Sequence, residues 1–300
     1  MNRTPQSKRF WRILGPILIY WGIQFFAQMI VQTVIMLMNS QEMLRIMQSV
    51  QSEDYMEMVA QVAVELTELM LKYQSLIAAF LALCTIPLTA FLFSRDRKME
   101  RDAQLPVNKK ASAKQYVWIL LFGCAFCLGM NVVTVMSGLA MKDTTYITVS
   151  AELYSERIAV LILCQGMIVP IAEELMFRGV LYRRCREEMG FWGAALSVAC
   201  FFAFVHGTVT QVLYTLVLGL FLAYFYEKFG SLRAAVVLHM LVNIISVLIT
   251  KTGALVWLCS EFMRMGICIV GCAFIGAAAF VQIRKIEEKP EARENESSFC

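Results

Sequence analysis

Eight long apolar runs, almost free of charged residues, dominate this chain of 300 residues. A run of about 20 such residues is long enough to cross the hydrocarbon core of a bilayer as a helix. Hydrophobic residues make up 59% of the sequence and charged residues only 17%, whereas soluble domains carry roughly 25% charged residues. The sequence therefore predicts an all-α fold, a polytopic transmembrane bundle of about eight helices, and excludes an ordinary soluble enzyme.

The boundaries of the expected spans follow from where polar stretches interrupt the apolar ones. The spans are Ile13–Met38, Ser75–Phe93, Val117–Met141, Ile158–Tyr182, Phe191–Val205, Thr208–Tyr226, Ala234–Thr250 and a last run ending near Ile283. Seven of the ten cysteines lie within these runs, where they act as small apolar residues and form no disulfide framework. A net charge of +4 spread over 300 residues forms no basic face, so we expect no nucleic-acid partner.

The distribution of Lys and Arg predicts the orientation, because cytoplasmic loops carry an excess of both. With the N-terminus placed inside and the segments alternating, 20 basic residues fall inside and 6 outside. We therefore expect both termini to be cytoplasmic, in an integral, multi-pass protein of the cell (plasma) membrane with the lipid bilayer as its surroundings.

Three regions are expected along the chain. Residues 1–150 hold the first three transmembrane helices, with an amphipathic outer segment at 40–73. Residues 151–285 form a catalytic helical core with helices four to eight, and residues 286–300 form a polar cytoplasmic tail. In the first span, glutamines recur at intervals of four residues. We interpret them as a packing seam, with the wall of a wet cavity as the alternative; they are Gln24, Gln28 and Gln32.

Ionisable residues are rare within the expected spans, and each is costly to hold in hydrocarbon, so each is a candidate for function. The fourth span carries Glu173, Glu174 and Arg178. The only two histidines of the chain, His206 and His239, also lie within spans or at their ends. This coincidence predicts one polar site inside the bundle.

Spacing sharpens this prediction. Glu174 and Arg178 are four residues apart and can pair on one helix face, which leaves Glu173 about 100° away around the helix. His239 and Asn243 share the same spacing. His206 is the most distant member, so the fifth helix must start late, tilt or break for the site to close. Together a carboxylate, two imidazoles and an amide can activate a water molecule and stabilise an oxyanion; the candidates are Glu173, His206, His239 and Asn243.

Three motifs follow one another on the fourth, fifth and seventh spans: Glu173-Glu174-x-x-x-Arg178, Phe202-x-x-x-His206 and His239-x-x-x-Asn243. In this order they resemble the CPBP family of intramembrane endopeptidases. That family includes the type II CAAX prenyl proteases and bacterial proteins linked to bacteriocin processing and self-immunity. The resemblance runs from about Val160 to Asn243. It implies that Glu173 is the general base, helped by His206, that His239 and Asn243 stabilise the oxyanion, and that Glu174 and Arg178 support the site.

The resemblance leaves the cofactor open, because this family has been described both as metalloproteases and as metal-independent glutamic proteases. The chain has no His-Glu-x-x-His zinc signature. An amide also suits an oxyanion better than a zinc ion, so we expect no cofactor. The alternative is a catalytic zinc held by Glu173, His206 and His239.

The expected function is an intramembrane endopeptidase that cleaves a peptide or protein substrate, lipidated or not, near the cytoplasmic side. One alternative is a non-catalytic membrane protein that acts in immunity or as a scaffold. Another is a transporter with a buried proton relay. Against transport, the two halves of the chain lack matching helices broken by Gly or Pro.

Overall fold

The computed structural model describes residues 6–49, 55–104 and 108–287, and this part of the chain is helical with no strand. The predicted all-α transmembrane bundle is confirmed, since seven helices are long and apolar enough to span a bilayer. Six of them are single helices: α1 (Gln6–Met38), α4 (Gln74–Asp102), α5 (Tyr116–Met136), α12 (Val209–Lys228), α13 (Leu232–Lys251) and α15 (Phe262–Arg284).

The seventh spanning helix, Ile158–Glu188, is a composite of five segments. Two of them have the wider turns of a π-helix, which are rare and occur mostly near functional sites. In chain order the segments are α8 (Ile158–Leu161), π-helical η2 (Ile162–Ile168), α9 (Val169–Glu174), π-helical η3 (Leu175–Tyr182) and α10 (Arg183–Glu188).

The fifth expected span is shorter than the others. It is α11 (Phe191–Phe204), whose 14 residues extend only about 21 Å at the helical rise, against roughly 30 Å of hydrocarbon. The chain turns at residues 205–208, and α12 begins at Val209. This early end brings His206 down into the bundle, which answers the requirement that the fifth helix start late, tilt or break.

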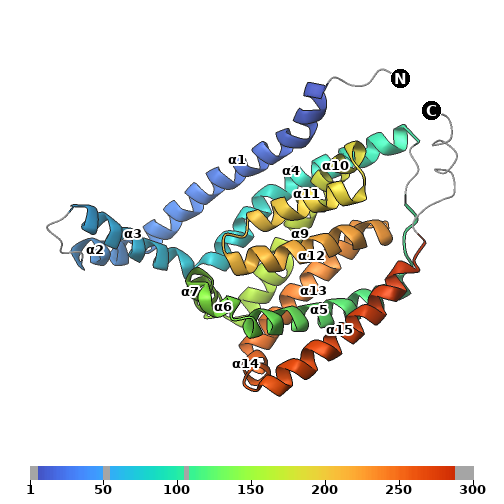
Figure 1. The fold of residues 1–300 in the computed structure, drawn as a ribbon. Helices are drawn as coiled ribbons and strands as arrows, with labels where there is room; N and C mark the ends of the chain where they lie inside the picture. Colours follow the sequence, from blue (N-terminus) through green and yellow to red (C-terminus); the bar gives the residue numbers. More distant parts are fainter. Residues whose placement is uncertain (1–5, 50–54, 105–107, 288–300) are drawn as a thin grey trace.

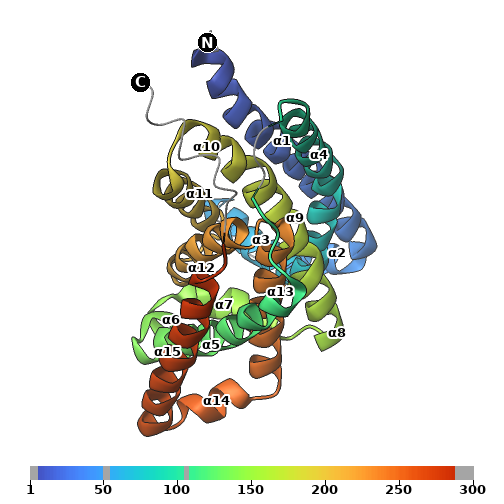
Figure 2. The same ribbon diagram turned by 90° about the vertical axis from the view of Figure 1, so that its right-hand side faces the viewer.

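The long helices form two outer pairs around a centre. Figures 1 and 2 show α1 beside α4 on one side, α5 beside α15 on the other, and α9 and α13 between the pairs. The start of α1 and the end of α15 lie at the same end of the bundle (Figure 1), which we call the terminus end. Short helices gather at the opposite end: α2 (Ser40–Ser49), α3 (Tyr55–Leu71), α6 (Leu139–Lys142), α7 (Thr144–Leu153) and α14 (Ala254–Cys259).

The segment expected to be amphipathic, residues 40–73, is largely α2 and α3, which project from the bundle in Figure 1; its residues 50–54 lie outside the described part. Of the predicted tail at 286–300, only Ile286 and Glu287 are described, and Ile286 packs against the core.

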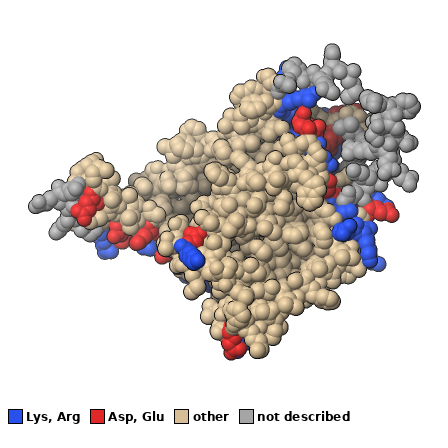
Figure 3. Space-filling view, in the orientation of Figure 1, with Lys and Arg blue, Asp and Glu red and all other residues tan. Residues whose placement is uncertain are grey.

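The surface of the bundle matches a lipid environment. Charged side chains gather at opposite ends of the face in Figure 3, with an uncharged band between them. Large apolar side chains on α1 and α15 point outward, for example Phe25, Phe26 and Phe274, which are 62%, 66% and 76% exposed. Contiguous apolar surface of this kind is expected where a protein meets the membrane.

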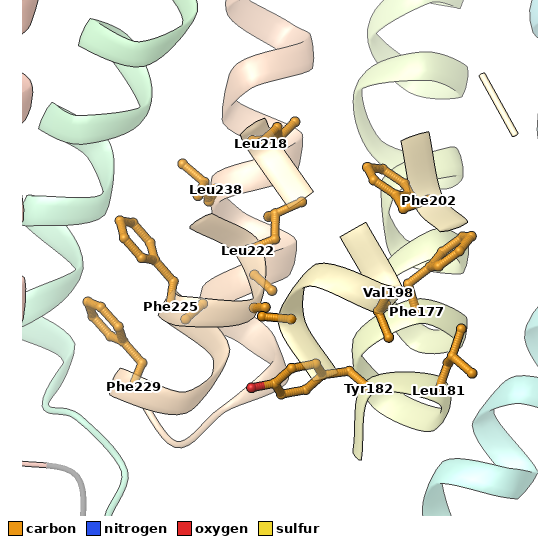
Figure 4. Packing of buried hydrophobic residues seen from close by; sticks show 14 of the residues in the cluster. Phe177, Leu181, Tyr182, Val198, Phe202, Leu218, Leu222, Phe225, Phe229 and Leu238 are labelled. Carbon is orange, nitrogen blue, oxygen red and sulfur yellow. The ribbon is translucent and has the colours of Figure 1, made fainter. Parts of the chain in front are cut away.

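The terminus end is closed by ion pairs. Arg184 binds the Asp96 carboxylate with two nitrogens, at 2.7 and 3.1 Å, and both side chains are buried. Nearby, the Tyr182 hydroxyl donates to Glu227 at 2.8 Å. Beneath them lies a layer of apolar side chains (Figure 4) that are at most 4% exposed, including Phe177, Leu181, Val198, Leu222 and Phe225. This layer separates the terminus end from the polar interior.

Candidate active site

A cavity of about 380 Å³ lies inside the bundle, within the roughly 300–1,000 Å³ typical of ligand sites. All four candidates for catalysis line it, although they come from three separate places in the fold. Glu173 is on α9, His206 is in the turn after α11, and His239 and Asn243 are on α13. The structure therefore brings together the residues that the spacing argument had grouped.

His239 is held between the two neighbouring glutamates of α9. Its Nδ1 lies 2.9 Å from Glu174 Oε1, and its Nε2 lies 3.7 Å from Glu173 Oε2. The hydrogen bond from Nδ1 to a carboxylate fixes the orientation of the ring, as it does for many functional histidines. Since His239 is only 3% exposed, the ring presents its Nε2 edge to Glu173 and the cavity.

Glu174 and Arg178 form the expected pair, fully buried behind His239. Arg178 Nη1 donates to Glu174 Oε1 at 2.8 Å, and both side chains are 0% exposed. The second nitrogen, Nη2, donates to the carbonyl of Gly219 on α12 at 3.1 Å. The same carboxylate oxygen therefore accepts from Arg178 and contacts His239, which joins η3 to α13, and Arg178 extends the connection to α12.

Phe202 connects the two histidines from the fifth span. Its ring lies 4.7 Å from the His206 ring and 5.7 Å from the His239 ring, in edge-to-face arrangements. Its carbonyl oxygen lies 2.7 Å from His206 Nδ1. Arg178 covers the Phe202 ring at 4.6 Å. With Nδ1 occupied, His206 has Nε2 available on the cavity side.

Asn243 has a structural partner as well as a place on the cavity wall. Its Nδ2 donates to the carbonyl of Gln165, in η2, at 2.9 Å. Pro170 follows Gln165 by five residues, the spacing of a π-helical hydrogen bond, and has no N–H to offer. The amide of Asn243 thus takes the place of a missing helical donor, and its second hydrogen remains for a ligand.

Polar residues that the sequence analysis did not single out are just over half of the residues lining the cavity. Fifteen of the 21 lining residues are polar; those outside the three motifs are Asn131, Thr134, Tyr146, Ser150, Tyr154, Gln165, Thr210, Gln211, Tyr214, Thr215 and Ser246. Uncharged polar residues scattered along apolar helices give no signal above background singly. Their gathering depends on helix packing, which no single helix encodes.

A second cavity, of about 130 Å³, lies on the other side of Glu173 beside α1. Tyr20 and Gln24 contribute its polar groups, and Gln24 Nε2 donates to the Tyr20 hydroxyl at 3.2 Å. Glu173 lines both cavities. For Gln24, the alternative of a cavity wall therefore describes the structure better than a packing seam.

The large cavity lies in the half of the bundle away from the terminus end. Its wall includes Tyr146 and Ser150 of α7 and Thr210 and Gln211 at the start of α12, all at the end opposite the two termini. The expectation of a site near the cytoplasmic side does not fit this arrangement if the termini are cytoplasmic. The reason is that α11 ends early and leaves space at its far end, while the apolar layer fills the near end.

Asp143, between α6 and α7, holds this far end together. Its carboxylate accepts hydrogen bonds from the backbone N–H groups of Tyr146 and Thr210, both at 2.9 Å. These hydrogen bonds, from Thr210 foremost, hold the pKa of Asp143 below its usual value. One carboxylate thus caps the first turns of α7 and α12, and it fixes the turn that carries His206.

The residues named as alternative zinc ligands all line the large cavity. Within residues 6–49, 55–104 and 108–287, no three His, Cys, Asp or Glu side chains converge closely enough to hold a metal ion. His239 uses Nδ1 for Glu174, and His206 uses Nδ1 for a backbone carbonyl. Zinc-binding histidines commonly use one ring nitrogen in this way and bind the ion with the other, so a zinc ion held by Glu173, His206 and His239 stays the alternative.

Comparison with known proteins gives one match. Residues 155–245, less than a third of the chain, match the model of a family described as Type II CAAX prenyl endopeptidase Rce1-like. No curated protein and no solved structure matches. The family match covers all three motifs and confirms the resemblance inferred from them. It supports, at the level of the family, an intramembrane protease of the CAAX type in a multi-pass membrane protein that acts on a peptide or protein.

Proposed function

We propose that this family match reflects a glutamate-based endopeptidase, in which Glu173 activates a water molecule for attack on a peptide bond. The observation that carries the proposal is that a carboxylate, two imidazoles and an amide from three parts of the fold line one cavity. Glu173 is the group with free carboxylate edges in that cavity, because Glu174 is engaged by Arg178 and His239. Glu173 therefore acts as the general base, and Glu174 acts as a positioning residue.

The proposed reaction has one tetrahedral intermediate, with one proton transfer before it and one after it. Glu173 takes a proton from water, with His206 orienting the water, and the oxygen attacks the carbonyl carbon of the substrate. The oxyanion that forms receives hydrogen bonds from Asn243 Nδ2 and from His239 Nε2 when it carries a proton. The intermediate then collapses, the C–N bond breaks, and protonated Glu173 gives its proton to the departing amine.

The proposal needs no metal. Its chemistry rests on a carboxylate in a water-poor cavity, where fixed hydrogen-bond donors act more strongly than in bulk water. A zinc enzyme at this place would instead bind the ion through Nε2 of His206 and His239 together with Glu173, since each Nδ1 already has a partner. A chelator therefore tests the mechanism directly.

The test uses purified protein in detergent and a mixed peptide pool, with cleavage read by mass spectrometry. Glu173→Gln should lower the rate by about 10²–10⁴, the usual contribution of a general base. Glu261→Gln is the matched control, because Glu261 is exposed and pairs only with Arg264 near the end of α14. Cleavage should persist in a strong zinc chelator.

Three results would count against the proposal in different ways. Cleavage by Glu173→Gln at the rate of the control would remove Glu173 as the base. Cleavage lost in chelator and restored by zinc would keep a protease but replace the mechanism. No cleavage of any peptide would favour a non-catalytic role in immunity or as a scaffold.

A further inference from the structure

The large cavity is closed on one side of the catalytic candidates. Between Glu173 and the terminus end lie the apolar side chains of Figure 4, among them Phe177, Leu181 and Leu222, each at most 4% exposed. Behind that layer the buried pair of Arg184 and Asp96 fills the remaining space. A substrate entering from the terminus end would have to displace both, so this end offers no entrance.

The opposite side is polar and is covered by one short helix. Tyr146 and Ser150 of α7, with Tyr154 just after it, follow at intervals of four residues and face the cavity together. Because α7 contributes a row of hydroxyl groups, this side can meet the N–H and C=O groups of a peptide. Thr210 Oγ1 and Tyr214 Oη, also on this wall, are buried without a hydrogen-bond partner among the described residues.

An extended peptide supplies a hydrogen-bond donor and an acceptor at every residue. This suits Thr210 Oγ1 and Tyr214 Oη, the two buried hydroxyl groups of the wall without a partner among the described residues.

The charge distribution identifies the face concerned. The segments on the side of the two termini carry 20 basic residues against 6 on the other side, so the terminus end is predicted to be cytoplasmic. Resting on the proposed function, we infer that the site takes an extended peptide segment from the extracytoplasmic face, opposite the terminus end. Its substrates are then secreted peptides or the outer segments of membrane proteins.

Sealed vesicles that hold the protein in both orientations test from which face of the membrane the peptide enters. The full chain carries an epitope tag after Cys300, and a protease added outside reports which vesicles expose the tag. A membrane-impermeant fluorogenic peptide, taken from those cleaved by the protein in detergent, is then added outside. We expect cleavage in vesicles whose tag is protected, at ten times or more the rate of vesicles whose tag is exposed. Glu173→Gln serves as the blank. After detergent is added, the cleavage rates of the two kinds of vesicle should be equal.

The outcomes separate this inference from the proposed function. Cleavage mainly in vesicles with an exposed tag would overturn the inferred face and leave the endopeptidase intact. The tag is also located on intact cells. If it lies on the outside of the cells, cleavage in vesicles whose tag is protected would overturn the extracytoplasmic assignment. Absence of any Glu173-dependent cleavage after detergent would contradict the proposed function itself, and the inference with it.

Discussion

The shared carboxylate of Glu174 leads to the sharpest prediction about stability. Glu174 Oε1 lies 2.8 Å from Arg178 Nη1 and 2.9 Å from His239 Nδ1, and the Glu174 and Arg178 side chains are fully buried. Glu174 Oε2 and Arg178 Nε have no hydrogen-bond partner in the described structure. Glu174→Gln removes the charge and keeps the shape, which leaves Arg178 buried without a counter-charge.

The size of the effect follows from burial. Removing one partner of a buried ion pair costs about 3–5 kcal/mol, because the other charge is left uncompensated. The exposed pair of Arg264 and Glu261 has nearly the same N–O distance, 2.7 Å, but such surface pairs contribute about 0–1 kcal/mol. At roughly 2–4 °C per kcal/mol, Glu174→Gln should lower the Tm by about 6–20 °C, and Glu261→Gln by less than about 4 °C.

Thermal unfolding in detergent, followed by intrinsic fluorescence, measures both shifts under one condition. A double variant, Glu174→Gln with Arg178→Met, should recover part of the lost stability, because it removes the buried charge that the single change strands. Equal Tm shifts for Glu174→Gln and Glu261→Gln would refute the reasoning. A double variant whose loss of Tm exceeds the sum of the losses in its two single variants would refute it as well.

Three further predictions concern the surroundings of the site. Gly219→Val should destabilise the protein by about 1–3 kcal/mol in the same assay, because a Cβ there would come within 3.0–3.2 Å of Ala199 on α11. Gly271→Val on α15 is the control: a Cβ there meets nothing within 4 Å, so the stability should change little. Asn243→Leu should lower kcat by about 10²–10³ at unchanged KM, and a change in KM alone would contradict an oxyanion role. Asp143 has a lowered pKa, so its stabilising effect is complete above its unfolded pKa of about 3.9 and is lost as the pH falls through the lowered value. The Tm difference between wild type and Asp143→Asn should therefore shrink below pH 4. A Tm difference that stays constant with pH would contradict this.

The sequence predicted the class of the fold and the membership of the site, because both depend on local signals. Apolar runs mark helices wherever they occur, and a glutamate or histidine inside such a run is conspicuous by its cost. The depth of each group was harder to predict. The run from Phe191 to Val205 predicts the end of α11 at Phe204 to within one residue, but not where that end lies relative to the neighbouring helices. The turn there is fixed by Asp143, more than 60 residues earlier in the chain.

The same limit explains why the expected side of the site and the predicted orientation of the chain do not agree. The separation of ten residues between Glu173 and Arg183 in the sequence sets the depth of Glu173 below the basic end of its helix at about 15 Å, but not the direction in which its cavity extends. That direction depends on which spaces between helices are filled, here by Phe177 and Leu222 on one side. Filling of this kind comes from side chains on several helices, and no pattern within one helix contains it.

The π-helical segments around α9 have a consequence for how this region tolerates changes in length. Because π-turns hold an extra residue, gaining or losing one within η2 can be absorbed by a change of turn width, which keeps α9 in phase. The same change inside α9 would rotate the helix by about 100°, the angle between neighbouring residues. An inserted residue ahead of Glu173 would turn Glu173 to the direction that Glu174 now takes, and a deleted one would turn Glu174 to that of Glu173. Either change would break the present arrangement, with one carboxylate at the cavity and the other against His239. Insertions and deletions among related chains should therefore fall in η2 and avoid α9.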